Sequence, residues 1–303
     1  MESKPPAGMT LAAPWRPYLS DEMAAVIMPL VVYWLYSGLY HLVEVLVPSG
    51  VKAYRLHTWD ESSKNLTSVP KVVGGVLLQQ ALQAGVAVAL FVFDDSTQRS
   101  QPEPDTWVQI GQLLVAMFIM DTWQYFCHRW MHVNKFMYRH FHSVHHRLTA
   151  PIAFGALYNH PVEGLLMDTV GGALSFLLSG MSTRLAVLFY CFATMKTVDD
   201  HCGLWLPLNP FQKLFSNNSA YHDIHHQLHG GKYNFSQPFF VFWDRILGTY
   251  MEVKVLRREE DGCLQAAPAV CRVSAYLPGV ELKRRQERKR SRFCVGLFST
   301  SSG

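Results

Sequence analysis

Histidines gather in one part of this chain of 303 residues: twelve of the fourteen lie between residues 128 and 229. Most fall into three short boxes, one His-x-x-x-His and two copies of His-x-x-His-His. In an α-helix, residues at i, i+3 and i+4 share a face, so each box predicts a group of imidazoles that point the same way. The boxes are His128/His132, His142/His145/His146 and His222/His225/His226.

Imidazole as the repeated side chain indicates a transition metal. Iron, zinc, copper and nickel accept imidazole ligands, whereas calcium and magnesium prefer oxygen. Eight box histidines are too many for one ion, so the pattern predicts two metal ions, with open coordination positions if the site is catalytic. A single His-x-x-x-His could be structural, but three spaced boxes favour a metal site.

The first two boxes need a bend between them. In a straight helix they would lie about 14 residues apart, or roughly 20 Å at about 1.5 Å per residue. One metal site could not use both boxes at that distance. We therefore expect the helix to break near residues 133–135.

The elements that carry these boxes belong to a membrane protein. Hydrophobic residues make up 49% of the chain and charged residues only 17%. Apolar runs cover residues 23–40, 72–93 and 107–127, with Asp121 the one charge in the third. Each run is long enough to cross a bilayer of about 30 Å, which favours three transmembrane helices over buried helices of a soluble protein.

A fourth apolar region, residues 164–195, predicts a re-entrant helical hairpin. Small residues at 179–182 interrupt it, and its second half is too short to cross a bilayer. If the histidines before and after it serve one site, the region must cross the membrane twice or not at all. Asp168 within its apolar sequence is expected to face protein or water rather than lipid.

The distribution of Lys and Arg predicts the orientation. The loop after the first run holds four basic residues, Lys52, Arg55, Lys64 and Lys71, whereas the loop at 94–106 holds only Arg99. Basic residues favour the cytosolic side of a membrane. The loop at 94–106 and the amino terminus should therefore be lumenal, and all three histidine boxes should be cytosolic. No cleavable signal peptide is expected, and the six cysteines, which form no Cys-x-x-Cys pair, are expected to be reduced.

These patterns give a domain plan. We expect an all-α integral membrane protein with about three full transmembrane helices, the re-entrant hairpin and a cytosolic, histidine-rich helical di-metal domain. Residues 283–292 contain seven basic residues, which suit a solvated segment near anionic lipid headgroups better than a nucleic-acid site. The plan is an N-terminal segment (1–22), transmembrane helices (23–127), a catalytic region (128–252) and a basic, disordered tail (253–303).

The boxes and two further motifs carry a family resemblance. Between the second and third boxes lie Asn-His-Pro-x-Glu at 159–163 and Asp-His-x-Gly at 200–203. In this order the motifs resemble the membrane-bound fatty acid hydroxylase superfamily, over roughly residues 20–252. The sequence at 226–250 is similar to that of the plant sphinganine C4-hydroxylases within it.

The resemblance implies an endoplasmic reticulum enzyme with two iron ions on the cytosolic side. It would use O2 and electrons from NAD(P)H, delivered by a separate cytochrome b5 and its reductase, to hydroxylate carbon 4 of sphinganine or dihydroceramide, giving phytosphingosine. Zinc can replace iron in purified protein of this kind. The implied ligands are the eight box histidines, with His201 and His160 as additional candidates.

Two groups of alternatives stay open. A sterol methyl oxidase, a desaturase or an aldehyde decarbonylase would keep every box and differ in the substrate pocket. A membrane zinc-binding or transport protein should instead carry its histidines inside the apolar runs, whereas here the three boxes lie outside them. An unactivated methylene offers no acidic proton to a general base, so its oxidation needs a metal rather than a Ser-His-Asp arrangement.

Overall fold

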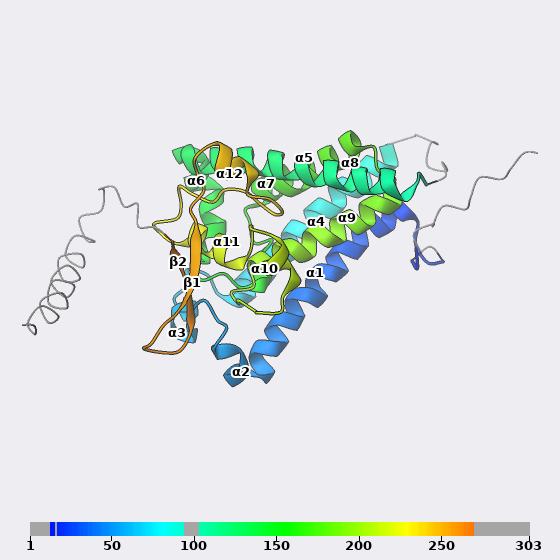
Figure 1. Ribbon diagram of the computed structural model, residues 1–303. Coiled ribbons are helices and arrows are strands. Elements are labelled where there is room, and N and C mark those ends of the chain that lie inside the picture. The colour runs from blue at the N-terminus through cyan, green and yellow to red at the C-terminus, as the bar shows by residue number, and fades with distance from the viewer. Residues whose placement is uncertain (1–12, 16, 94–102, 270–303) are drawn as a thin grey trace, which may run out of the picture. The chain divides into compact units, whose positions relative to one another are not determined.

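The computed structural model describes residues 13–15, 17–93 and 103–269, which fold mainly as helices (Figure 1). The long helices are α1 (Asp21–Leu46), α4 (Val69–Phe93), α5 (Thr106–Val133), α8 (Gly171–Ser179) and α9 (Thr183–Asp200). The shorter helices are α2 (Pro48–Lys52), α3 (Trp59–Ser63), α6 (Lys135–His140), η2 (His142–Arg147), η3 (Ala153–Gly155), α7 (Pro161–Gly164), the π-helix η4 (Leu165–Val170), α10 (Pro210–Leu214), α11 (Ser219–His226) and α12 (Phe242–Ile246). The strands are β1 (Val253–Arg257) and β2 (Leu264–Pro268).

Helices α1, α4 and α9 run side by side, and α5 and α8 pack together above them (Figure 1). Polar groups buried between α1 and its neighbours find partners: Tyr33 donates to the carbonyl of Phe154 at 2.7 Å, and Tyr40 donates to Asp199 at 2.5 Å. Since a buried polar group without a partner would destabilise the fold, these bonds fix α1 against the region that carries the histidines.

The prediction of three long apolar helices is confirmed, but their identity differs in one case. Among the residues that the structure describes, three helices are long and apolar enough to cross a membrane, at residues 21–46, 69–90 and 161–179. The predicted third run, 107–127, lies in α5, whose polar residues lower its mean hydropathy. One of them, Asp121, is buried and accepts the backbone N–H groups of Phe239 and Phe240 at 3.0 and 2.6 Å. These hydrogen bonds fix α5 to the core of the fold, although other side chains of α5 expose apolar surface.

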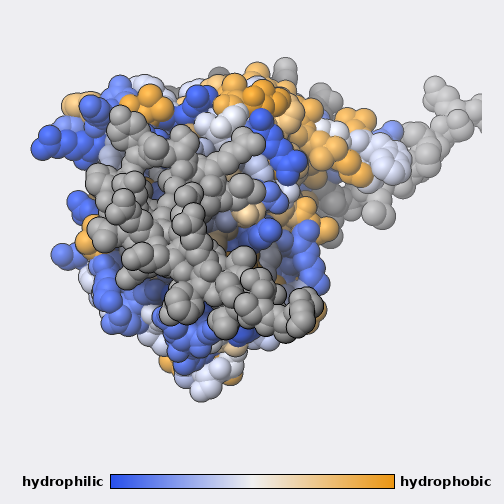
Figure 2. All heavy atoms as spheres, turned by 60° about the vertical axis from the view of Figure 1, so that its left-hand side comes forward, coloured by the Kyte–Doolittle hydropathy of each residue, from blue (hydrophilic) through white to orange (hydrophobic). Residues whose placement is uncertain are grey.

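Large hydrophobic side chains remain exposed on the long helices. On the face drawn in Figure 2, hydrophobic residues gather along the upper right and hydrophilic residues cover much of the left and bottom. Exposed residues of this kind include Leu35, Leu42, Leu46, Leu77, Leu78, Leu90, Leu114, Phe118, Leu177 and Leu178. Contiguous exposed apolar surface of this extent is typical of contact with lipid.

The region predicted as a re-entrant hairpin contains two helices joined by a short turn. Helix α8 ends at Ser179, Gly180 has a φ of +65°, and Ser182 begins α9 by accepting the N–H of Leu185 at 3.1 Å. As predicted, Asp168 faces protein, accepting from Gln83 and Gln124 at 3.3 and 3.4 Å. That the hairpin enters the bilayer without crossing it stays a prediction.

Residues 253–268 were predicted to belong to a disordered tail of an all-α protein. They form an antiparallel β-hairpin instead. Val253 pairs with Pro268 and Arg257 with Leu264. The apolar residues alternate along the strands, so Leu264 and Ala266 reach the core beside Leu56 and Ile224, which lies in the third box. The fold is thus not purely α, and the hairpin supports α11. The basic run at 283–292 lies outside the described residues.

Candidate metal centre

The predicted break between the first two boxes is confirmed. Helix α5 ends at Val133, and the side chain of Asn134 caps α6 by accepting the N–H groups of Phe136 and Met137 at 3.0 and 3.1 Å. An Asn side chain at this position satisfies N–H groups that have no partner within the new helix. The chain then turns, and the second box follows in the short helix η2.

The structure gathers nine histidines into two neighbouring clusters. Within each cluster, the nitrogens that face a common point all lie within 4.8 Å of one another. Rings of the two clusters also contact each other, with the centroids of His146 and His226 4.7 Å apart. The five-histidine cluster is His128, His132, His142, His146 and His225, and the four-histidine cluster is His145, His201, His222 and His226.

The two His-x-x-His-His boxes exchange their middle histidines. His145 leaves its own box to join the four-histidine cluster, and His225 leaves its own to join the five-histidine cluster. The sequence predicts that all three rings of a box point the same way, and this is wrong in detail. In α11, residues at i and i+3 differ by about 60° around the helix, which suffices to aim them at two different points when the clusters are adjacent. The second box lies in the 3-10 helix η2, whose turn differs from that of the α-helix expected from the spacing.

The ring nitrogens that face away from the clusters show which nitrogens are free to bind. The Nδ1 atoms of His128, His201 and His225 each lie 2.8 Å from a backbone carbonyl oxygen. A carbonyl only accepts, so each Nδ1 carries the proton and each Nε2 presents a lone pair to its cluster. The Nε2 of His225 has no hydrogen-bond partner although it is buried.

Distances between the inward nitrogens suit metal ions. The Nε2 atoms of His142 and His132 lie 2.8 Å apart, and those of His222 lie 2.9 and 3.0 Å from His201 and His226. Two nitrogens bound to one ion at right angles, with bonds of about 2.1 Å, would lie about 3.0 Å apart. Lone pairs so close repel unless a cation lies between them. The residues therefore fit two metal ions.

Burial keeps these imidazoles neutral. Desolvation lowers the pKa of His145 to about 4 and, with the neighbouring imidazoles, the pKa of His201 to about 3. Desolvation likewise lowers the pKa of His225 to about 3. A metal binds the deprotonated ring, so at neutral pH no proton has to be displaced from these ligands.

Of the ten predicted ligands, only His160 belongs to neither cluster. Its Nδ1 accepts the N–H of Val162 at 3.2 Å and caps α7, and its ring packs on Phe141. The chemistry of this motif lies in Glu163, which sequence reasoning missed: its carboxylate is buried and lies 2.6 Å from Nδ1 of His142. A carboxylate behind a ligating histidine fixes the ring and raises its basicity.

Sequence reasoning also missed His57, which comes from the loop after α1. Its Nε2 lies 2.6 Å from Asp223, the residue that follows the ligand position His222. This contact ties the first loop to α11 over a long sequence separation. A lone histidine far from the boxes gave no signal for it.

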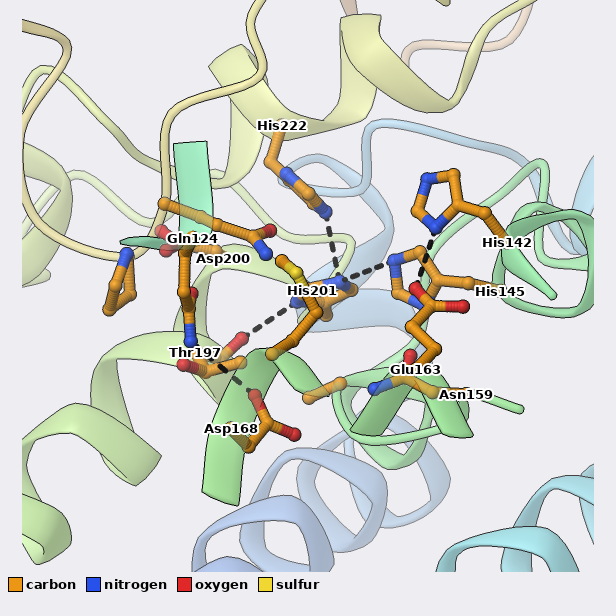
Figure 3. Close-up of a pocket in the computed structure, with 14 residues that line it drawn as sticks. Gln124, His142, His145, Asn159, Glu163, Asp168, Thr197, Asp200, His201 and His222 are labelled. Atoms are coloured by element: carbon orange, nitrogen blue, oxygen red, sulfur yellow. Dashed lines mark hydrogen bonds and ion pairs between the residues drawn. The ribbon is translucent and has the colours of Figure 1, made fainter. Parts of the chain in front are cut away.

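A small cavity of about 30 Å³ adjoins the four-histidine cluster (Figure 3). His145, His201 and His222 form one side, and Asp168, Thr197 and Gln124 lie across from them in the view of Figure 3. The remaining lining residues include Asn159, Glu163, Asp200 and Pro238. Such a volume holds one or two small polar groups and lies where a reacting atom would meet the metal.

Comparison with known proteins places residues 113–249 in the family described as "Fatty acid hydroxylase". The chain is 59% identical to a rice (Oryza sativa) protein named very-long-chain aldehyde decarbonylase, over 82% of this chain and 96% of that protein. It is 58% identical to sphinganine C4-monooxygenase 1 of Arabidopsis thaliana, over 82% and 95%. With sphingolipid C4-hydroxylase of Saccharomyces cerevisiae it shares 41% identity, over 77% and 73%. No solved structure matches.

Proposed function

The chain belongs to the fatty acid hydroxylase family, and on that premise we propose that it hydroxylates carbon 4 of a sphingoid base. The observation that carries the proposal is the nine-histidine centre in a chain whose Arabidopsis and yeast relatives are named for C4-hydroxylation. The substrate would be sphinganine or dihydroceramide, and the product its 4-hydroxylated form, phytosphingosine or phytoceramide.

The two clusters would hold two iron ions, with open positions left for O2. When bound, the metals supply the oxidising power needed to break an unactivated C–H bond. The electrons would come from NAD(P)H through cytochrome b5 and its reductase. His160 drops out of the proposed ligand set because it caps α7, and the nine clustered histidines remain.

The protein's own residues would orient and shield this chemistry. Glu163 holds the ring of His142, and backbone carbonyls hold three further rings, so the ligand nitrogens are fixed before a metal arrives. The cavity beside the four-histidine cluster would receive carbon 4. Its small volume limits the water that could intercept the reaction.

The enzyme would lie in the endoplasmic reticulum membrane with its histidines on the cytosolic side. Three apolar helices support the membrane location, and the basic residues of the first loop support the orientation. A lipid substrate could then enter from the bilayer while its polar headgroup stays at the membrane surface.

The proposal is tested in cells that lack sphinganine 4-hydroxylation, by mass spectrometry of their long-chain bases. The intact chain and the His229→Ala variant should both produce phytosphingosine, since His229 is exposed and belongs to neither cluster. The His145→Ala variant, which lacks a ring of the four-histidine cluster, should produce at least about a hundredfold less.

If all three forms insert stably and none produces phytosphingosine, the proposal is wrong. Conversion of a long-chain aldehyde to an alkane by the same membranes would then assign the chain the activity for which its rice relative is named.

A further inference from the structure

Three carboxyl groups line the cavity beside the four-histidine cluster, and no Lys or Arg lines it among the described residues. Two of the three have partners of their own: Glu163 lies 2.6 Å from Nδ1 of His142, and Asp200 pairs with the buried Lys196 at 2.5 Å. The third, Asp168, has only amide partners.

The amide partners of Asp168 come from two other helices. Gln83 of α4 donates to one carboxylate oxygen at 3.3 Å, and Gln124 of α5 donates to the other at 3.4 Å. Both bonds are long, and neither partner carries charge. The charged form of a carboxyl group in an apolar interior is costly unless it is paired, so a cation in this cavity would stabilise the carboxylate of Asp168.

Asp168 lies in a segment whose backbone departs from the regular α-helix. Residues Leu165–Val170 form a π-helix between α7 and α8. A π-helical turn inserts an extra residue into an α-helix and is frequently found at functional sites. Buried Glu163 has one carboxylate oxygen without a partner on the same cavity. Glu163, with one unpartnered oxygen, and Asp168, with no charged partner, therefore line the same cavity.

The substrate class of the proposed function offers a cation at the right distance. A free sphingoid base carries an ammonium on carbon 2, three single bonds of about 1.5 Å from carbon 4, and so at most about 4 Å from it. With carbon 4 at the metal, the ammonium would lie within about 4 Å of that carbon and within reach of the residues that line the cavity. Asp168 lines that cavity together with His145, His201 and His222.

We propose that Asp168 binds the ammonium of a free sphingoid base and so selects this substrate over its N-acylated form. The inference rests on the proposed function and specifies its substrate. An N-acylated base has a neutral amide at carbon 2, which cannot pair with the carboxylate. Gln83 and Gln124 hold the carboxylate in place without neutralising it.

The experiment measures binding of radiolabelled sphinganine to the purified full chain in lipid nanodiscs, with unlabelled competitors. N,N-dimethylsphinganine, which keeps the positive charge, should compete within about threefold of sphinganine. N-acetylsphinganine, which is neutral, should compete at least about tenfold less well. Equal competition by the neutral compound would overturn the inference. Because only the intact chain is used, the result does not depend on the folding of a variant.

Variants test the residue itself. Asp168→Asn keeps the size and an acceptor for one of the two glutamines but removes the charge, so sphinganine affinity should fall at least about tenfold while N-acetylsphinganine affinity changes less than about twofold. Asp168→Glu should keep the preference. Asp60→Asn, which removes an exposed carboxylate of α3, is the matched control.

Turnover of the two substrates in membranes separates this inference from the proposed function. If the intact chain hydroxylates sphinganine and Asp168→Asn alters both substrates equally, the inference is wrong and the function stands. If the intact chain hydroxylates neither, the proposed function is wrong and the assignment of Asp168 falls with it.

Discussion

At the scale of single residues, the position of one proton decides what each ring of the centre can do. Wherever Nδ1 faces a carbonyl or carboxylate, Nε2 is left as a lone pair aimed into a cluster. The ligand set is thus determined by backbone carbonyls and Glu163 as much as by the histidines.

Glu163 is the residue at which this idea is most easily tested. Replacing it by Gln removes the charge behind His142 and leaves a group that can donate as well as accept. We expect metal affinity to fall about 10- to 100-fold in Glu163→Gln, measured by competition with a chelator. The Asp60→Asn variant, which removes an exposed carboxylate of α3, should retain normal affinity. Equal affinity in Glu163→Gln would contradict the role given to this carboxylate.

Acid should destabilise the metal-free protein. In the unfolded chain histidines titrate near pH 6.5, whereas in the fold burial lowers the pKa of His145 to about 4 and of His201 and His225 to about 3. Between pH 6.5 and about 4 the unfolded state therefore binds more protons, and the free energy of unfolding falls as the pH falls. The slope is up to about 1.4 kcal/mol per pH unit for each such histidine.

The measurement is the denaturation midpoint of the metal-free protein in detergent at pH 7 and pH 5. The midpoint should be lower at pH 5, and the His229→Ala variant should show the same dependence as the intact chain. A midpoint independent of pH would contradict burial of these rings in the neutral form.

At the scale of elements, short connections place the rings. Gly203 closes the turn after α9 with a φ of +69°, and a Cβ there would lie 2.6 Å from the carbonyl oxygen of Pro151. Only glycine fits both the conformation and the close approach. This explains the glycine of the Asp-His-x-Gly motif, which keeps His201 in the four-histidine cluster.

Gly203→Ala should therefore lower the free energy of unfolding by at least about 2 kcal/mol, through positive φ and the backbone clash together. It should also reduce metal binding. Gly231→Ala is the control, because a Cβ at that position meets no atom within 4 Å. Comparable stability of the two variants in chemical denaturation would show that the turn tolerates a side chain.

The elements also show what sequence can predict. The break near residue 134 was predictable because spacing alone made one straight helix incompatible with a shared site. The exchange of His145 and His225 was not, because it depends on how η2 and α11 face each other. The β-hairpin was missed because each strand is short and contains only two alternating apolar residues. A strongly basic run follows it in the sequence, which favoured the prediction of a disordered tail.

At the scale of the whole molecule, the histidine clusters depend on segments far apart in the chain. Carboxylate and carbonyl partners come from residues 158–163, 197 and 233–235, and His57 contributes from the first loop. The sequence predicted a membrane protein because its apolar runs are long enough to cross a bilayer. It could not predict which polar residues of α5 are satisfied inside the fold, as Asp121 is.

The central claim is that nine histidines form two adjacent metal sites. It is tested most directly by the metal-to-protein ratio of the full chain, purified from iron-supplemented cells and measured by elemental mass spectrometry. We predict about two transition-metal ions per chain, mainly iron with some zinc, and a loss of about one ion when His222 and His226 of the four-histidine cluster are both replaced by Ala. A ratio of one or less in the intact, folded chain would contradict the account.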